Sequence, residues 1–202
     1  MTVAIDGTLI RRAQAAEAER LGGLIADEFQ HLPVAAELSP EPGPRRAAMS
    51  GQFAMLTAHG IAYGDVDVID DAGEPVAVAV WLPPDEIPDI EDYDERLAAI
   101  CGPLLGRFQE LDGLMHDSHP AGPPHAYLAF LAVRQAYQNR GLGSRLLVAH
   151  HAALDEAGTP AYLEASSPRS RALYARHGFA DYAPPYGLDG GEHFWPMWRD
   201  AR

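Results

Sequence analysis

The chain of 202 residues contains no lysine, and all 15 of its basic residues are arginines. The absence of lysine excludes P-loop chemistry, Schiff-base enzymes and the phosphate clamp of kinases. A single cysteine, Cys101, excludes an internal disulfide and a cysteine zinc site, and it fits a reducing compartment. The longest clearly apolar runs, 76–82 and 127–133, have the length of strands and are too short to span a bilayer. We therefore expect no membrane partner.

Positive charge is also scarce, with 15 basic residues against 29 acidic ones and a formal net charge of -14. This is the wrong sign for binding a phosphate backbone, so we expect no nucleic-acid partner. Residues 1–6 lack the basic and apolar segments of a signal peptide. Length and a hydrophobic fraction of 47% predict one globular domain over residues 1–202. We expect a cytoplasmic protein of bacterial type.

Apolar periodicity predicts the elements of the first part of the chain. They are a strand over 9–12, a helix over 14–29, a proline-punctuated loop over 33–44, a helix over 45–59 that stops at Gly60, and two strands between 66 and 82 that turn at 70–73. Residues 83–126 keep a helical period broken at Gly102-Pro103, which predicts a helical excursion between two strands. It could form a wall of a substrate pocket or a dimer surface, so a homodimer stays open.

The last third alternates strands and helices. The predicted order is a strand over 127–133, a helix over 142–157, a strand over 161–165, a helix over 167–177, and strands from Phe179 onward and over 194–199. A strand, a helix and a second strand in this order imply a crossover connection and a parallel pair.

A glycine-containing turn over residues 138–144 follows the apolar strand and enters an amphipathic helix. Unpaired N–H groups and partial positive charge at a helix N-terminus can receive phosphate, and Arg140 and Arg145 add charge there. Leu146 stands where a dinucleotide fingerprint would have its third glycine. The turn therefore predicts a pyrophosphate cradle of another class, and a plain strand-to-helix turn is the simpler alternative.

In its full context, LAVRQAYQNRGLG over residues 131–143, the turn resembles the acetyl-CoA motif of the GNAT N-acetyltransferase superfamily. The run LYARHGF over 173–179 resembles the tyrosine-containing helix of the same family. The resemblance implies an α/β fold, with a single GNAT-type domain. Its central, mixed and mostly antiparallel twisted sheet would have six to seven strands flanked by helices. A parallel splayed pair would lie at the acetyl-CoA site.

Three further stretches, over residues 125–128, 163–169 and 195–199, look like the small-molecule branch that includes puromycin N-acetyltransferase. The resemblance implies acetyl transfer from acetyl-CoA, the co-substrate, to the amine of a small molecule. Two alternatives stay open. One is a peptide or protein N-acetyltransferase, which a wide groove would favour. The other is a non-catalytic acyl-CoA-binding module.

The same resemblance implies which residues would contact acetyl-CoA. Backbone groups of the strand would pair with the pantetheine arm, a backbone N–H near Val133 would stabilise the oxyanion, and the turn would surround the pyrophosphate. The cofactor-binding candidates are Leu131, Ala132, Val133, Gln138, Asn139, Arg140, Gly141, Leu142, Gly143, Ser144 and Ser170. Ser170 stands where the related branch often has asparagine, so its reach toward the cofactor is shorter.

Acyl transfer to an amine needs a neutral nucleophile and a protonated leaving thiolate. Tyr174 matches the family tyrosine and is the candidate general acid, although its spacing alone indicates a buried aromatic. Glu164 lies inside an apolar strand and is a candidate base, unless it forms a structural salt bridge. His125 is the second candidate base, with a structural histidine as the alternative.

Two histidine pairs, His116 with His119 and His150 with His151, lack cysteine or carboxylate at ligand spacing. We therefore expect no metal. The acidic run over residues 85–95 predicts a solvated face, which could also attract a cationic amine.

Overall fold

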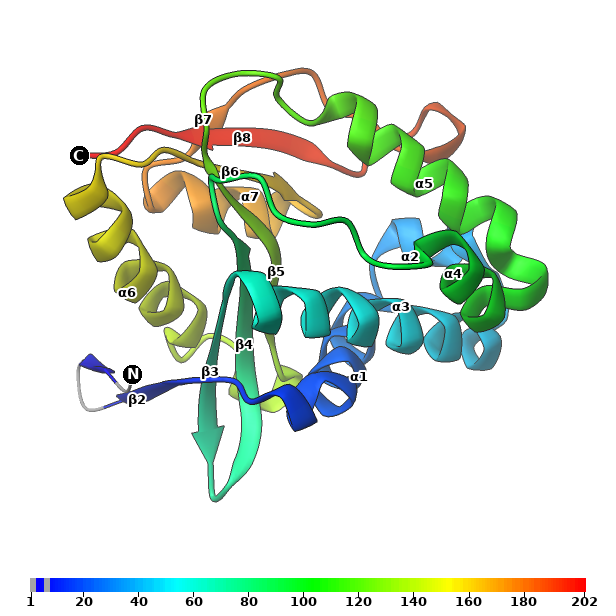
Figure 1. The fold of residues 1–202 in the computed structure, drawn as a ribbon, viewed down its shortest axis with the longest axis horizontal. Coiled ribbons are helices and arrows are strands. Elements are labelled where there is room, and N and C mark those ends of the chain that lie inside the picture. The colour runs from blue at the N-terminus through cyan, green and yellow to red at the C-terminus, as the bar shows by residue number, and fades with distance from the viewer. Residues whose placement is uncertain (1–2, 6–7) are drawn as a thin grey trace.

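The computed structural model describes residues 3–5 and 8–202. In that part of the chain, eight strands form one twisted sheet in the order β1-β2-β3-β4-β5-β6-β8-β7 (Figure 1). The strands are β1 (Val3–Ile5), β2 (Thr8–Arg12), β3 (Asp65–Asp71), β4 (Glu74–Leu82), β5 (Ala126–Val133), β6 (Ala161–Ala165), β7 (Ala180–Asp181) and β8 (Trp195–Arg199). Every neighbouring pair is antiparallel except β5 and β6, which are parallel. The mixed, mostly antiparallel sheet was predicted, and the count exceeds six to seven because short strands are added at both edges.

Helices cover both faces of this sheet. They are α1 (Ala18–Phe29), α2 (Pro33–Leu38), α3 (Pro42–Tyr63), α4 (Tyr93–Cys101), α5 (Leu105–Ser118), α6 (Leu142–Ala157) and α7 (Pro168–Arg176), with short 3-10 turns η1 (Ala15–Glu17), η2 (Gly102–Leu104), η3 (Gln135–Tyr137) and η4 (Leu188–Gly190). Among the described residues, no helix combines the length and apolar composition needed to cross a membrane.

The proline-rich segment over 33–44 was predicted as a loop, and this prediction is wrong in part. Pro33 begins α2 and Pro42 begins α3. Proline is favourable at the first position of a helix, where its missing N–H needs no partner. The predicted stop at Gly60 is also wrong, because α3 continues to Tyr63.

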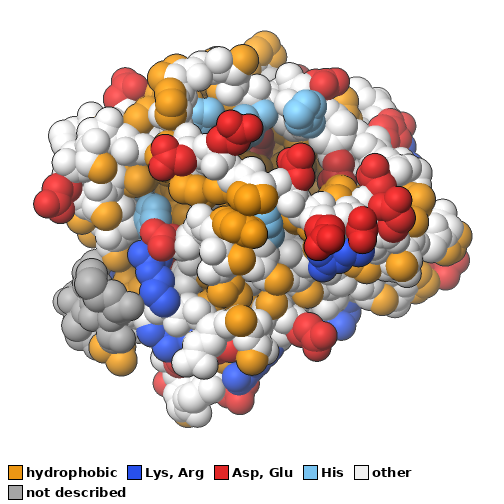
Figure 2. All heavy atoms as spheres, in the orientation of Figure 1, with side chains coloured by type: hydrophobic (Ala, Val, Ile, Leu, Met, Phe, Trp, Pro, Cys, Tyr) orange, Lys and Arg blue, Asp and Glu red, His pale blue; other side chains and the backbone are white. Residues whose placement is uncertain are grey.

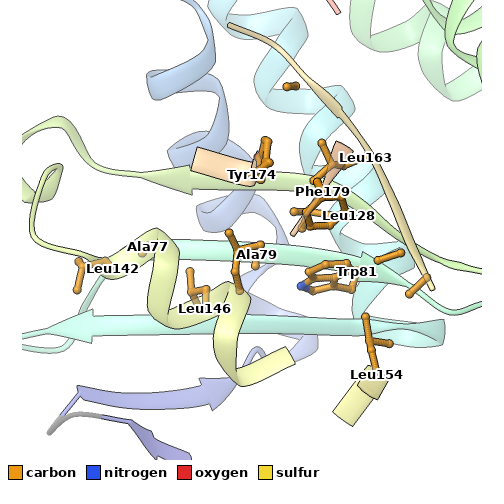
Figure 3. Close-up of a cluster of buried hydrophobic side chains, with 14 of the residues drawn as sticks. Ala77, Ala79, Trp81, Leu128, Leu142, Leu146, Leu154, Leu163, Tyr174 and Phe179 are labelled. Atoms are coloured by element: carbon orange, nitrogen blue, oxygen red, sulfur yellow. The ribbon is translucent and has the colours of Figure 1, made fainter. Parts of the chain in front are cut away.

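The central strand β4 separates two cores because its side chains alternate between the faces. Ala77, Ala79 and Trp81 pack with Leu146 of α6 and with the buried face of α7 (Figure 3). Val78 and Val80 belong to the opposite cluster, which includes Leu21, Leu24 and Ile25 of α1. Burial on both faces explains why residues 76–82 form a continuous apolar run.

Two glycines interrupt α1, and one of them is required by packing. A side chain at Gly22 would place its Cβ 2.4 Å from the backbone nitrogen of Ala54 in α3. Gly22 therefore permits α1 and α3 to pack closely against each other. These two helices form one wall of the site described below.

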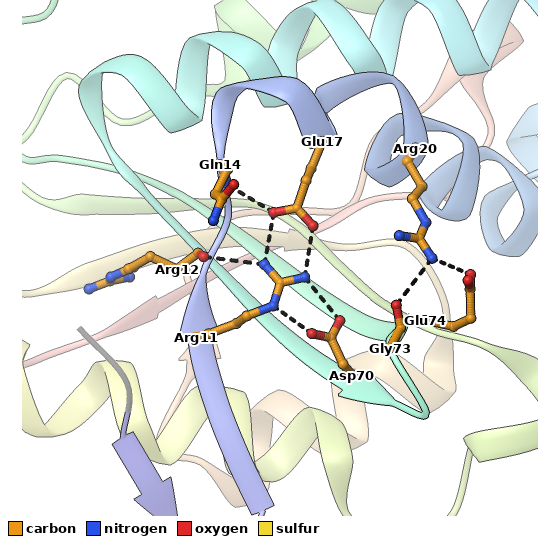
Figure 4. Close-up of polar contacts among 8 residues, drawn as sticks. All are labelled: Arg11, Arg12, Gln14, Glu17, Arg20, Asp70, Gly73 and Glu74. Atoms are coloured by element: carbon orange, nitrogen blue, oxygen red, sulfur yellow. Dashed lines mark hydrogen bonds and ion pairs between the residues drawn. The ribbon is translucent and has the colours of Figure 1, made fainter.

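Arginine side chains fasten α1 to the sheet. Arg11 of β2 donates to both oxygens of Glu17 at 2.7 and 2.8 Å and to Asp70 of β3 (Figure 4). Arg20 of α1 pairs with Glu74 at the start of β4. These partly exposed pairs orient the N-terminal elements more than they stabilise them.

Helices α2, α4 and α5 and the N-terminal half of α3 form a helical layer beside the sheet, and the rest of α3 packs on α1 and on strands β3 and β4 (Figure 1). Leu38, Met49, Leu97 and Phe108, one from each helix, belong to its buried cluster. The predicted break at Gly102-Pro103 is confirmed, since α4 ends at Cys101 and α5 begins at Leu105.

Candidate functional site

The glycine turn places unpaired N–H groups at the start of α6. Gly141 is the N-cap of α6 with φ of 80°, a left-handed conformation that favours glycine. The first hydrogen bond of the helix runs from the Arg145 N–H to the Gly141 carbonyl at 3.0 Å. The N–H groups of Leu142, Gly143 and Ser144 consequently have no partner inside the helix. These three N–H groups make the N-terminus of α6 suited to binding an anion.

Strands β5 and β6 separate beside this turn. They pair only at Ala126 with Ala161 and at Tyr127 with Tyr162. A register shift in the pairing of β4 with β5 leaves one extra residue, Ala129, in β5. A bulge of this kind increases local twist and bends the strand, which accounts for the divergence from β6.

The divergence exposes a backbone edge of β5. The Arg134 N–H donates to the Val76 carbonyl of β4 at 2.9 Å. Because backbone groups alternate along a strand, those of Leu131 and Val133 lie on the edge away from β4, and those of Ala132 face β4. Gln138 Nε2 donates to the Val133 carbonyl at 3.0 Å. The edge can therefore receive an extended amide-containing chain.

The turn and this edge line a cleft of about 500 Å³, called here the open cleft. All but one of the predicted cofactor-binding residues line it. They are Leu131, Ala132, Val133, Gln138, Asn139, Gly141, Leu142, Gly143, Ser144 and Ser170. Arg140 is the exception: its guanidinium stacks on the Tyr137 ring at 4.9 Å.

Two arginines that sequence reasoning did not assign to this site, Arg169 and Arg176 of α7, line the open cleft. Arg169 donates to Gln138 Oε1 at 2.9 Å and to Asn139 Oδ1 at 3.1 Å. It therefore ties α7 to the turn and adds positive charge. Arg169 lies 30 residues after Asn139 in the sequence, and its place in the stretch over 163–169 gives no sign of a contact with the turn.

The Ser170 hydroxyl is hydrogen-bonded to Ser167 at the start of its own helix, α7. The Ser167 N–H donates to Ser170 Oγ at 3.0 Å, and Ser170 Oγ donates to the Ser167 carbonyl at 3.0 Å. The first of these bonds and the bond from the Ser170 N–H to Ser167 Oγ at 3.1 Å form a capping box at the start of α7. Ser170 lines the open cleft, and its contact with a cofactor stays a prediction.

A second hollow of about 270 Å³, called here the inner cavity, adjoins the open cleft. Its wall comes from helices α1 to α5, strands β4 to β6 and helix α7. Six residues line both spaces, which shows that the two meet along the splayed strands. These residues are Phe29, Leu32, Leu131, Ser166, Ser170 and Tyr174.

Tyr174 lies where the two spaces meet. Its side chain belongs to the buried core beside Leu163 and Phe179, and the residue is 7% exposed (Figure 3). Burial raises the pKa of the Tyr174 hydroxyl well above its usual range. The hydroxyl therefore carries its proton at neutral pH and can donate it.

Glu164 of β6 faces the inner cavity. Tyr127 donates to Glu164 Oε2 at 2.8 Å, whereas buried Oε1 accepts no hydrogen bond from the described residues. Burial raises the pKa of Glu164 to about 7, and nearby tyrosine hydroxyls offset part of that effect. The described residues give Glu164 no ion pair, so the salt-bridge alternative is not supported. A carboxylate with this pKa can accept a proton near neutral pH.

The structure does not bring His125 together with Tyr174 and Glu164. His125 lies at the opposite end of β5 from the turn, in a different hollow beside Pro83 and Pro84. Its Nδ1 contacts the Pro123 carbonyl at 2.8 Å, and its Nε2 contacts His119 at 3.1 Å. A role for His125 as base stays a prediction that this position does not favour.

Histidines 150 and 151 are buried on α6. His150 stacks on Trp81 with ring centroids 4.2 Å apart. Burial lowers the pKa of His151 to about 3, which keeps it neutral. Within residues 3–5 and 8–202, no group of three or more potential ligands could hold a metal ion.

Comparison with known proteins places this geometry among acetyltransferases. The model of the acetyltransferase (GNAT) family matches residues 35–179. A crystal structure of histone acetyltransferase HPA2 and related acetyltransferase from Corynebacterium glutamicum is 28% identical, with a TM-score of 0.72 and 96% of each chain covered.

Two more distant structures share the fold. The PaiA N-acetyltransferase of Thermoplasma acidophilum, in complex with coenzyme A, is 11% identical, with a TM-score of 0.59 and coverage of 95% of this chain and 97% of that one. Arylalkylamine N-acetyltransferase 2 of Aedes aegypti is 14% identical, with a TM-score of 0.57 and coverage of 96% and 98%.

Proposed function

The chain belongs to the acetyltransferase (GNAT) family, and from that premise we propose that it transfers an acetyl group from acetyl-CoA to the amine of a small molecule. The observation that carries the proposal is the junction at Tyr174, where the open cleft meets the inner cavity. The cleft suits the donor because it offers helix N–H groups, Arg169 and an open strand edge. The cavity suits a compact acceptor because side chains enclose it.

The position of each residue gives it a separate role in the proposed reaction. Leu131 and Val133 would pair with the pantetheine arm, and the turn over 138–144 with Arg169 would hold the phosphates. Acetyl-CoA supplies the acetyl group as a thioester. Tyr174 holds a proton at its hydroxyl, available to the sulfur when the bond from carbon to sulfur breaks. Glu164 takes the proton that the amine loses as its nitrogen bonds to the acetyl carbon.

The small-molecule assignment has two supports. The inner cavity is an enclosed space of about 270 Å³, which suits a compact ligand better than an extended peptide. The stretches over residues 163–169 and 195–199 look like the branch that includes puromycin N-acetyltransferase.

A peptide or protein acceptor is the second candidate. It is favoured by the likeness to the Corynebacterium glutamicum structure, whose description includes histone acetyltransferase. A peptide would need to enter past the helical layer of α2 to α5, which forms much of the cavity wall.

An acceptor panel tests the proposal. Purified protein would be mixed with acetyl-CoA and a set of alkyl amines, aryl amines and basic peptides, and both released CoA thiol and acetylated product would be measured. We expect amines to be acetylated with a higher kcat/KM than any peptide. Preferred peptide acetylation would overturn the small-molecule assignment. Tight CoA binding by calorimetry without any transfer would identify a non-catalytic acyl-CoA-binding module.

A further inference from the structure

A second carboxylate, Asp112 of α5, lines the inner cavity. Tyr93 of α4 donates to Asp112 Oδ2 at 2.6 Å, and Gln52 Nε2 of α3 donates to Oδ1 at 3.1 Å. These three residues do not line the open cleft, whereas Tyr174 and Ser166 line both spaces. Asp112 and its two partners therefore belong to the side of the cavity built by α3, α4 and α5, away from the residues that the two spaces share.

Asp112 has no cationic partner among the described residues. Burial raises the pKa of this carboxyl, and the bonds from Tyr93 and Gln52 offset only part of that effect. In the described part of the chain no arginine lines the inner cavity, and burial lowers the pKa of His59, a histidine that lines it. A half-buried carboxylate in a largely apolar wall is costly unless a positive charge accompanies it.

Glu164 supplies an independent sign of a ligand in the same cavity. Its Oε1 is buried without a hydrogen-bond partner among the described residues. Glu164 belongs to β6, one of the two splayed strands, and lies two residues before Ser166, which lines both the open cleft and the inner cavity. The cavity thus has one carboxylate on a splayed strand and another on the side built by α3, α4 and α5.

The surface between these two carboxylates and the remaining wall is largely apolar. Side chains such as Phe53, Phe130, Leu111 and Met115 contribute to it. An apolar wall forms no hydrogen bond with a polar group in the middle of a ligand. It does suit a chain of methylene groups or an aromatic spacer.

From this arrangement we propose that the acceptor is a diamine: one amine reacts beside Glu164 and Tyr174, while a second, protonated amine pairs with Asp112 across an apolar spacer. The inference rests on the proposed N-acetyltransferase activity and names its substrate class. Only the free amine is acetylated, and the distal ammonium group keeps its proton throughout.

The outer surface fits a ligand with two positive charges. The seven acidic residues of the run over 85–95 are all exposed, in the loop before α4 and in its first turn. Figure 2 shows acidic side chains gathered around a hollow on this face, near α4 and α5 of Figure 1. Such a field attracts dications more strongly than monocations.

Three primary amines of equal length would test the inference, ending in a methyl, a hydroxyl or an ammonium group. For the wild-type protein we expect kcat/KM to rise in that order, with the diamine at least about tenfold above the methyl compound. Spacers of three to eight methylene groups, in roughly one-carbon steps, would locate the best length.

Asp112→Asn removes the charge while keeping the shape. We expect the ratio of kcat/KM for the diamine over the amino alcohol to fall by roughly 10- to 100-fold. The matched control is Asp117→Asn, which removes the same charge from the exposed face of α5 and should leave that ratio unchanged. Thermal unfolding and CoA calorimetry would verify that both variants are folded.

The outcomes distinguish the diamine inference from the proposed N-acetyltransferase activity. If the wild type acetylates the methyl compound as well as the diamine, or Asp112→Asn keeps the preference, the diamine inference is overturned and the N-acetyltransferase activity stands. If no amine is acetylated although CoA binds, the proposed function fails and the inference fails with it.

Discussion

The open cleft and the inner cavity meet at Tyr174 but are built in opposite ways. The open cleft uses backbone groups of β5 and α6, with Arg169 as its bridging charge. The inner cavity uses side chains, most of them from helices α1 to α5, with two half-buried carboxylates, Asp112 of α5 and Glu164 of β6, in an apolar wall. One space suits a long anionic donor and the other a compact cationic acceptor.

The difference shows how one fold can keep its donor and change its acceptor. Backbone groups cannot be substituted, so recognition of acetyl-CoA depends mainly on the path of the chain through the turn and the splayed strands. Recognition in the inner cavity depends on individual side chains carried by five helices. Such side chains can change without disturbing the sheet.

The largest expected effect lies at the junction. Tyr174→Phe removes the proposed acid, so we expect kcat to fall by roughly 100- to 1,000-fold while the Kd for CoA changes less than about twofold. Steady-state assays and calorimetry measure the two quantities. Tyr182→Phe, an exposed tyrosine, is the control. Unchanged turnover would refute the assignment of Tyr174.

The next prediction concerns charge in the inner cavity. Because burial raises the pKa of Glu164 from its ordinary 4.5 to about 7, the folded protein keeps a proton that the unfolded chain releases between these pH values. Stability contributed by that proton is complete below pH 4.5 and is lost as the pH rises toward 7. Glu164→Gln should therefore be more stable than wild type by about 2 to 3 kcal/mol at pH 8, and no more stable at pH 4.

The same variant tests the base. In wild type, kcat/KM should rise with pH through about 7, as Glu164 loses its proton. Glu164→Gln should lack that ascending limb, and Glu156→Gln, an exposed control on α6, should retain it. A profile that Glu164→Gln leaves unchanged would remove the base role.

A smaller effect is expected in the open cleft. Arg169→Ala should weaken CoA binding by about tenfold, or about 1.4 kcal/mol, because it removes a charge and the bonds to Gln138 and Asn139. Calorimetry at two salt concentrations would measure this. Arg171→Ala on the same helix pairs outside the cleft with Asp181 and should bind CoA normally. Equal losses in both variants would contradict a local role.

The smallest expected effect is the difference in stability between alanine substitutions at two glycines of the same turn. Gly141→Ala should cost about 1 kcal/mol of stability, because φ of 80° strains any side chain. Gly143→Ala should cost less than about 0.5 kcal/mol, since its Cβ would meet Leu173, Leu131 and Val133 at ordinary distances of 3.6 to 3.8 Å. Denaturant titration would compare them, and a reversed order would show that the turn differs from this geometry.

The elements predicted most closely from the sequence are those whose ends carry local signals. The sequence predicted α6, β6 and α7, because caps, proline and glycine mark their ends. Of the turn residues that the sequence predicted to bind the cofactor, all but Arg140 line the open cleft, and the Arg140 side chain stacks on Tyr137. Arg169 and Asp112 were missed because each acts on residues distant in sequence, and the stretch over 163–169 that contains Arg169 carries no sign of its contacts with the turn.

The sequence by itself determined the order of strands and helices apart from β1 and α2, the glycine turn and the resemblance of residues 131–143 to an acetyl-CoA motif. These depend on periodicity, caps and conformational preference, all of which are local properties of the chain. Only the tertiary structure decided that Tyr174 joins two spaces, that Glu164 and Asp112 share one of them, and that His125 lies elsewhere. Packing decides which faces meet, and the burial that follows sets the charge state of each carboxyl.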